Sequence, residues 1–249
     1  MTFNAGQGIR HMPKLLVLVS FLLLSACQLL PLGGQARYER QAWEERPAGC
    51  RGEACPLVNI DTLHFPDEPA LDRLIEQRLL EMTRLHANDP LPASLREYQR
   101  SYLSGAEPEQ TSYLQAQVRE QHDGLIVIEL SSYQYTGGAH GLPGRGFINY
   151  ERRGDRELQL ADLLLPGQEA AFWSLAAEAH QRWLVEKGHA TDKEFVAFWQ
   201  FQPTRNIALL SDRVLLKYDV YSIAPYASGH PELSIPKEQL RGILKPQYL

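Results

Sequence analysis

The residues of this chain whose type and setting could support chemistry are two histidines that follow or precede glycine in expected loops. His140 lies in residues 135–141, which hold three glycines in seven positions, and His230 follows Gly229 at the end of a second loop stretch, residues 221–230. An imidazole acts readily as a general base or as a metal ligand at neutral pH. Both kinds of site need further residues at defined spacings, so the neighbours of these histidines decide between them.

Those neighbours do not complete a known catalytic or metal-binding pattern. His140 has no second histidine at HxH or HxxxH spacing, and Ser132 and Ser228 lack the GxSxG elbow of a hydrolase. The sequence therefore predicts no catalytic residue, no metal site and no cofactor. One enzymatic alternative stays open, in which His140 acts with an acidic neighbour such as Asp162 or Asp219.

The two stretches are better explained as loops of one binding surface. Glycine permits backbone angles that other residues avoid, and it lets another surface approach the main chain. Tyrosine suits recognition because it offers a large area with a polar tip, although it also closes loops over cores. The candidate binding residues are Tyr135, Thr136, Gly137, Gly138, His140, Tyr221, Pro225 and Tyr226.

Residues 1–26 have the layout of a bacterial lipoprotein signal peptide. Arg10 and Lys14 precede an apolar run over residues 15–24, which is too short to span a bilayer. Leu24-Ser25-Ala26-Cys27 resembles a lipobox, so we expect cleavage before the cysteine and its lipidation. A plain signal peptide with an incidental cysteine is the alternative.

This layout predicts a protein of the bacterial cell envelope, lipid-anchored and facing the periplasm, with the outer membrane preferred over the inner. Translation could begin at Met1 or Met12. The formal net charge is −5, and cleavage would remove two basic residues and no acidic ones, which gives −7. Such a chain is unsuited to nucleic acid and better suited to a cationic protein.

Two cysteines remain after the lipobox, Cys50 and Cys55. An exported chain meets an oxidising compartment, so we expect these two to form a disulfide. A zinc site is the rival explanation, but it normally needs a second cysteine pair or nearby histidines. A bridge over so short a loop would mainly fix local shape.

The composition divides the chain into four regions. A signal peptide over 1–26 is followed by a flexible tether with a small disulfide loop over 27–55, which is rich in Gly, Pro, Gln, Arg and Glu. An N-terminal α+β part is expected over 56–122, beginning with a strand near residue 57. A C-terminal α+β part is expected over 123–249.

Apolar residues spaced by three and four predict helices, and period-two stretches predict strands. Ser94 and Glu97 would cap one helix, and Phe195, Phe198 and Trp199 would pack a short aromatic helix into the core. The expected helices cover residues 66–85, 94–103, 168–187, 192–199 and 236–243, and the expected hairpins turn at residues 122–124, 153–155 and 211–213.

Helices in blocks among hairpins predict an α+β fold with a mainly antiparallel sheet, built as a two-part module. Residues 135–141, 147–150, 160–163 and 223–229 stand in an order that resembles the RsiV-type extracytoplasmic domain family. That family supplies the outer domain of a lysozyme-sensing anti-sigma factor and also occurs beside peptidoglycan deacetylases.

The resemblance covers roughly residues 56–245 and implies a binding module exposed to the envelope. Its implied partner is lysozyme or another cell-wall-associated protein or glycan, and the acidic charge suits a cationic enzyme. The chain departs from the family's sensor by having a lipobox in place of a transmembrane helix, so anti-sigma signalling is not expected. A cell-wall hydrolase or deacetylase that uses His140 is the alternative.

Overall fold

The computed structural model describes residues 1–2, 34–84, 86 and 88–249. The expected signal peptide, Met12 and the lipobox with Cys27 lie outside the described residues. From Gly34 onward the chain forms one unit that contains two β-sheets. Its strands and helices give a mixed α+β fold, as the pattern of the sequence predicts.

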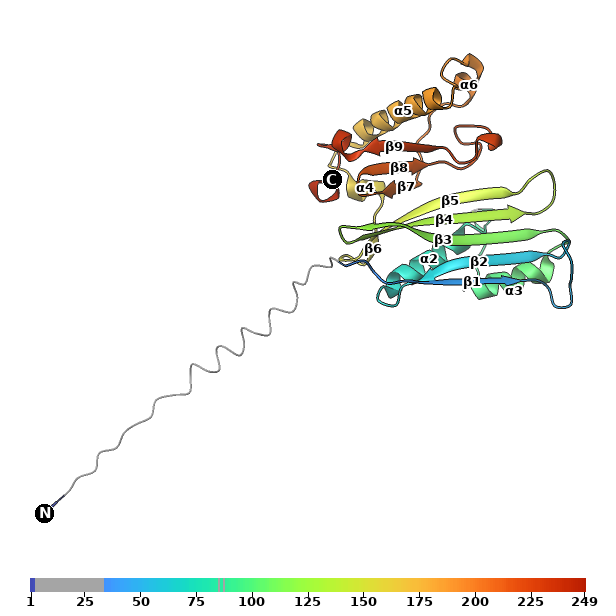
Figure 1. Ribbon diagram of the computed structural model, residues 1–249, viewed down its shortest axis with the longest axis horizontal. Coiled ribbons are helices and arrows are strands. Elements are labelled where there is room, and N and C mark those ends of the chain that lie inside the picture. The colour runs from blue at the N-terminus through green and yellow to red at the C-terminus, as the bar shows by residue number, and fades with distance from the viewer. Residues whose placement is uncertain (3–33, 85, 87) are drawn as a thin grey trace. The chain divides into compact units, whose positions relative to one another are not determined.

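The first sheet has six strands in the order of the chain (Figure 1). Its strands are β1 (Glu39–Glu45), β2 (Leu57–His64), β3 (Thr111–His122), β4 (Leu125–Tyr135), β5 (Leu142–Glu151) and β6 (Arg156–Glu157). All neighbours are antiparallel except β2 and β3, which are parallel. A parallel pair needs a crossover connection, and here that connection carries two helices.

The two crossover helices, α2 (Pro69–Glu81) and α3 (Leu95–Gly105), cover one face of this sheet. The apolar stripe of α2, which includes Ile75 and Leu79, packs with Ile60 of β2 and Leu114 of β3. At the start of α3, the Ser94 hydroxyl accepts a hydrogen bond from the Glu97 amide at 3.1 Å, which confirms the predicted cap.

The β3–β4 hairpin turns at Asp123 and Gly124, whose φ angles are 48° and 78°. Two successive positive φ values are the geometry of a type I′ turn, which Asp-Gly favours. The turn sets the register, so that Gln115 lies opposite Ser131 and Tyr113 opposite Tyr133. The hairpin thereby delivers loop 135–141, as the sequence predicts.

The second sheet is an antiparallel set of three strands with a helix on it. Its strands are β7 (Ile207–Leu209), β8 (Arg213–Lys217) and β9 (Glu232–Pro236), and the helices of this half are α4 (Leu160–Leu163), α5 (Glu169–Glu186) and α6 (Lys193–Phe198). Phe172 and Trp183 of α5 pack with Leu216 and Leu233 of the sheet. Gly188, with φ of 77°, follows the end of α5.

Asn149 of β5 joins the two sheets. Its buried side-chain amide donates to the Ile207 carbonyl at 2.7 Å, and its Oδ1 accepts from the Leu209 amide at 2.7 Å. The side chain thus pairs with β7 as a peptide group of a neighbouring strand would. Val127 and Phe147 form an apolar contact with the second sheet beside this pair.

The segment predicted as a tether contains β1, so that prediction is wrong over Glu39–Glu45. Most side chains of β1 are polar and exposed, so the segment lacks the apolar alternation that marks a strand. Its anchor is Trp43, whose indole donates to Gln99 at 2.7 Å and lies under Arg96, 3.9 Å from the ring centre. Tertiary contacts therefore order this strand.

Three further expectations need correction. The expected boundary at residue 122 falls inside the first sheet, and the two sheets instead separate between β6 and β7. Phe198 of α6 is 76% exposed, although its spacing predicted core packing. The final helix is a short 3₁₀ segment, Lys237–Leu240, and α2 begins at Pro69 because residues 66–67 form a turn.

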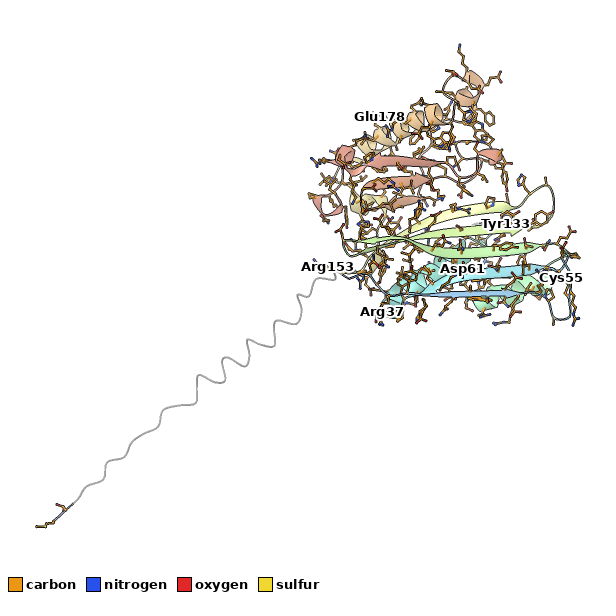
Figure 2. The ribbon with its side chains drawn as sticks, in the orientation of Figure 1. Arg37, Cys55, Asp61, Tyr133, Arg153 and Glu178 are labelled. Carbon is orange, nitrogen blue, oxygen red and sulfur yellow. A yellow bond between two sulfur atoms is a disulfide. The ribbon has the colours of Figure 1, made fainter. Side chains whose placement is uncertain are left out.

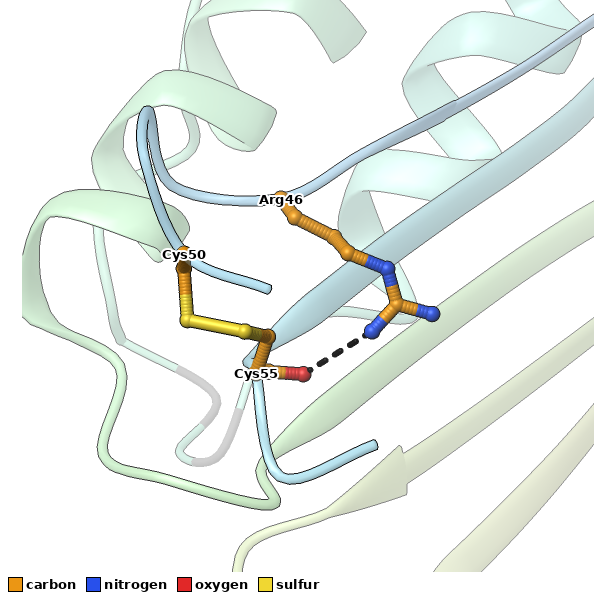
Figure 3. Close-up of a disulfide and its surroundings, with 3 residues drawn as sticks. All are labelled: Arg46, Cys50 and Cys55. Carbon is orange, nitrogen blue, oxygen red and sulfur yellow. Dashed lines mark hydrogen bonds between the residues drawn. A yellow bond between two sulfur atoms is a disulfide. The ribbon is translucent and has the colours of Figure 1, made fainter. Parts of the chain in front are cut away.

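The predicted disulfide between Cys50 and Cys55 is present (Figure 3). It closes the turn between β1 and β2, and the Arg46 guanidinium donates to the Cys55 carbonyl at 3.2 Å. The bridge therefore holds the edge strand's connection to β2. Over residues 34–84 and 88–249, each helix is too short or too polar to span a membrane.

His180 of α5 makes stability depend on pH. It is 2% exposed, stacks on Trp183, and neither ring nitrogen has a hydrogen-bond partner among the described residues. Burial lowers the pKa of this imidazole. An unfolded histidine titrates near pH 6.5, so below that pH the unfolded state binds more protons than the folded state, and stability rises with pH until about 6.5.

We therefore expect the free energy of unfolding to fall as pH drops from about 7 to about 5, and the His180→Leu variant to show a shallower fall. Urea unfolding at several pH values measures both. Some slope remains in the variant, because burial also lowers the pKa of His230. Identical pH profiles for the two proteins would exclude His180 as a cause.

Candidate functional site

Loops 135–141 and 221–230 meet, as the sequence predicts for one surface. The Tyr226 ring stacks on the His140 imidazole with centroids 3.9 Å apart. The Tyr221 ring lies 6.3 Å from His140 and 5.6 Å from Tyr226. Figure 1 shows both loops at the same end of their sheets, after β4 and after β8. Three rings from two distant segments thus form one cluster.

Hydrogen bonds hold His140 within this cluster. Its Nδ1 lies 3.0 Å from the Gly141 carbonyl, and because a carbonyl only accepts, Nδ1 carries the proton. The Tyr221 hydroxyl then donates to Nε2 at 3.3 Å, and the Tyr226 hydroxyl donates to the same Gly141 carbonyl at 3.2 Å. Both ring nitrogens are engaged, so His140 fastens one loop to the other.

The backbone conformation of loop 135–141 depends on two of its glycines. Gly137 and Gly138 have φ of 103° and 98°, which other residues rarely adopt. The Tyr135 hydroxyl donates to the Gly138 carbonyl at 2.9 Å and closes the loop on itself. The Gly141 amide donates to the Tyr133 hydroxyl at 3.2 Å, which ties the loop to β4.

Tyr221 is held outward in the second loop. Its φ of 67° is unusual for a residue with a side chain and costs about 1–3 kcal/mol. The side chain is 50% exposed despite its aromatic ring. Pro225 then leads into a 3₁₀ turn that presents Tyr226 to His140. A strained backbone that presents an exposed ring is a feature of functional surfaces.

Asp219 and His230 lie at the base of the second loop. The Asp219 carboxylate accepts from the Arg145 amide at 2.8 Å and lies 4.0 Å from His230. His230 donates through Nδ1 to the Tyr218 carbonyl at 3.0 Å. Burial raises the pKa of Asp219 and lowers the pKa of His230. These contacts connect β5 with the base of the loop.

Asp162 has a structural place. It accepts from the Gln159 amide at 2.8 Å in a capping box and pairs with Arg156 at 3.1 Å. The hydrogen bond from the Gln159 amide is the main reason why the pKa of Asp162 lies below its ordinary value. The enzymatic alternative needs Asp162 or Asp219 beside His140. Their contacts lie elsewhere, because Asp219 lies near His230 and Asp162 caps α4.

Two residues of this region carried no signal in the sequence. Leu142, directly after the first loop, is 60% exposed, and Tyr133 anchors the loop through Gly141. An apolar residue at the start of a strand looks like core in a sequence, so the exposure of Leu142 follows only from the fold. We define the loop surface by its ring cluster and exposed neighbours: Thr136, Gly138, His140, Leu142, Tyr221 and Tyr226.

The arrangement suits binding. The exposed Tyr221 and the half-buried Tyr226 offer apolar area and hydrogen-bonding groups beside glycine backbone. Among the described residues, His, Cys, Asp and Glu side chains form no group of three that could hold a metal ion. Figure 2 labels Tyr133, which marks the place where the loop surface meets the first sheet.

The chain is similar to several bacterial proteins. Residues 161–238, which run from α4 to the segment after β9, match the family model described as a protein of unknown function, DUF3298. Over 127 residues the chain is 26% identical to the peptidoglycan-N-acetylmuramic acid deacetylase PdaC of Bacillus subtilis. This match covers 50% of the chain and 27% of PdaC, so the chain spans about a quarter of that relative.

Two solved structures resemble the whole described unit. A DUF3298 family protein from Pseudomonas aeruginosa is 57% identical with a TM-score of 0.84, over 87% of this chain and 98% of that one. A member from Bacteroides fragilis is 20% identical with a TM-score of 0.67, over 86% of this chain and 96% of that one, and it supports the fold alone. The Pseudomonas similarity, over nearly the full length of that protein, identifies this chain as a member of the DUF3298 family.

Proposed function

We propose that this protein is a lipid-anchored component of the bacterial cell envelope whose loop surface binds a cell-wall-associated protein. One observation carries the binding role: His140, Tyr221 and Tyr226 bring two distant loops into a single cluster with an exposed tyrosine. The lipobox ending at Cys27 supports the lipid anchor. The partial similarity to PdaC, a deacetylase of peptidoglycan by its name, supports association with the cell wall.

The proposed partner is a cationic enzyme of the lysozyme kind. The chain has a formal net charge of −5, which steers encounter with a basic protein. The resemblance of the loop segments to the RsiV-type domain motivates the same partner. Aromatic side chains such as Tyr221 would then supply the buried centre of the interface.

Titration of the protein with lysozyme in a calorimeter tests this proposal at low and at physiological ionic strength. We expect saturable heat at both, with weaker binding at the higher ionic strength because salt screens the charge attraction. Absence of heat at both ionic strengths would remove lysozyme as the partner. Equal affinity at the two ionic strengths would contradict the role of charge.

A cell-wall hydrolase or deacetylase is the alternative that the similarity to PdaC motivates. The hydrogen bonds to both nitrogens of His140 argue against its use as a general base, since a base needs a free lone pair facing the substrate. Acetate or glycan release from peptidoglycan by the wild type, with loss in His140→Ala, would favour the enzyme instead.

A further inference from the structure

One face of the six-stranded sheet carries side chains that the fold does not use for its core. Helices α2 and α3 cover the opposite face, and the second sheet reaches this one at β4 and β5 through Val127 and Phe147. In β2, β3 and the far half of β4, the side chains that alternate with core residues are polar or aromatic and partly exposed. We call these residues the open face: Asn59, Tyr113, Gln115, Gln117, Ser131 and Tyr133.

The strand register places the residues of the open face opposite one another on neighbouring strands. Asn59, Tyr113 and Tyr133 are neighbours across β2, β3 and β4. The two tyrosine rings lie 6.1 Å apart at an interplanar angle of 64°, and Tyr113 is 39% exposed. Gln115 and Ser131 form the next row. Figure 2 labels Asp61 and Tyr133 on this face.

The charges next to the open face neutralise one another. Arg40 donates to the Asp61 carboxylate at 2.6 and 3.1 Å, and the Gln115 amide donates to the same carboxylate at 2.7 Å. Three hydrogen bonds thereby hold the Asp61 carboxylate, and one of them fixes the Gln115 side chain. Gln117 and Tyr113 are exposed, so the Gln117 amide and the Tyr113 ring can meet a ligand from solvent. The face therefore offers donors and acceptors without net charge.

A cleft closes one end of this face. It has a volume of about 330 Å³. The first sheet and the β7–β8 hairpin line it with two arginines, two glutamates and three uncharged residues: Arg119, Arg213, Glu120, Glu129, Gln117, Val118 and Leu210. The Lys217 ammonium holds Glu129 at 2.6 Å, and a β-bulge at Arg119 turns that side chain toward the cleft. From Tyr113 to Arg119, at about 3.3 Å per residue, the strand spans about 20 Å, so the open face leads along β3 into the cleft.

We propose that the open face and its cleft bind an uncharged polysaccharide chain that carries hydroxyl and acetamide groups. Asparagine and glutamine amides both donate and accept, which matches hydroxyl and acetamide groups on the ligand. The exposed ring of Tyr113 offers an apolar surface to a sugar ring. The balanced charge of the face suits a neutral chain and gives no attraction to a polyanion. Because the strands already hold these side chains in place, binding would cost little side-chain entropy.

This site is separate from the loop surface, and neither proposal depends on the other. They touch at Tyr133, whose hydroxyl accepts from the Gly141 amide. A variant at Tyr133 would therefore disturb both, and Tyr113 is the better residue for a test. Tyr38 is the matched control, since it is a tyrosine of similar exposure, 46%, packed against Phe65 of the helix-covered core.

The experiment titrates the full chain with soluble β-1,4-linked N-acetylglucosamine oligomers and follows heat and tyrosine fluorescence. We expect saturable binding, at least a tenfold loss in Tyr113→Ala, a several-fold loss in Gln117→Ala, and wild-type affinity in Tyr38→Ala. His140→Ala, in the loop surface, should bind the oligomers normally. Absence of binding by the wild type up to millimolar oligomer, or equal losses in Tyr113→Ala and Tyr38→Ala, would overturn the proposal.

Discussion

Replacement of Asn149 by alanine is expected to destabilise the protein by about 2–5 kcal/mol. The change removes two buried hydrogen bonds of 2.7 Å. The Ile207 carbonyl loses its donor, and the Leu209 amide loses its acceptor. Each unpaired buried backbone group costs about 1–3 kcal/mol. Urea unfolding of the two proteins at pH 7 measures the difference. Because Asn149 joins the two sheets, the variant should also lose cooperativity between them.

Asn59→Ala is the control for this result. Its side-chain amide donates to Glu44 at 3.3 Å in an exposed position, so we expect a change within about 0.5 kcal/mol. Asn149→Asp keeps the acceptor for Leu209 but places a carboxylate oxygen against the Ile207 carbonyl, and it should be destabilised as well. If Asn149→Ala unfolds like the wild type, the amide does not hold the sheets together.

Replacement of Gly141 by alanine is expected to disrupt the loop surface. A Cβ there would overlap the Tyr133 ring and approach the Gln134 carbonyl to 2.8 Å. Such overpacking costs about 1–3 kcal/mol, which the loop can relieve by moving Gly141 away from β4. That movement would break the hydrogen bonds of the Gly141 carbonyl with His140 and Tyr226. We therefore expect at least a tenfold weaker affinity for the protein partner.

Gly105→Ala is the matched glycine control. A Cβ at the end of α3 would meet no atom within 4 Å, and the φ angle of Gly105 lies outside the left-handed region. Its stability should stay the same or rise slightly, since alanine restricts the unfolded chain. Heteronuclear NMR spectra of both variants report where the backbone moves. Shifts confined to residue 141, with both loops unchanged, would show that the loop tolerates the methyl group.

Local patterns in the sequence predicted the elements that depend on local chemistry. The cap at Ser94, the turn at Asp123-Gly124 and the glycine after α5 each act through neighbours in the chain. The disulfide followed from two remaining cysteines and the expected compartment. The two loops were predicted to act together, and His140 stacked on Tyr226 brings them into contact.

Features that depend on distant contacts escaped prediction. The strand β1 is ordered by Trp43 against Gln99 and Arg96, which lie more than fifty positions away in the sequence. The amide of Asn149 looks like an ordinary strand residue until β7 is placed beside it. Phe198 has the spacing of a core residue, but α6 has no buried side chain to share its face. The spacing of apolar residues predicts which residues lie on the same face of a helix, but only the fold determines whether another element covers that face.

The most direct test of the loop surface is a lysozyme titration of Tyr221→Ala beside Tyr38→Ala. Both tyrosines are about half exposed, at 50% and 46%, and only Tyr221 belongs to the ring cluster with His140 and Tyr226. The account predicts that Tyr221→Ala loses at least tenfold in affinity and keeps its thermal stability, while Tyr38→Ala binds like the wild type. Equal affinities for the wild type and both variants would contradict it.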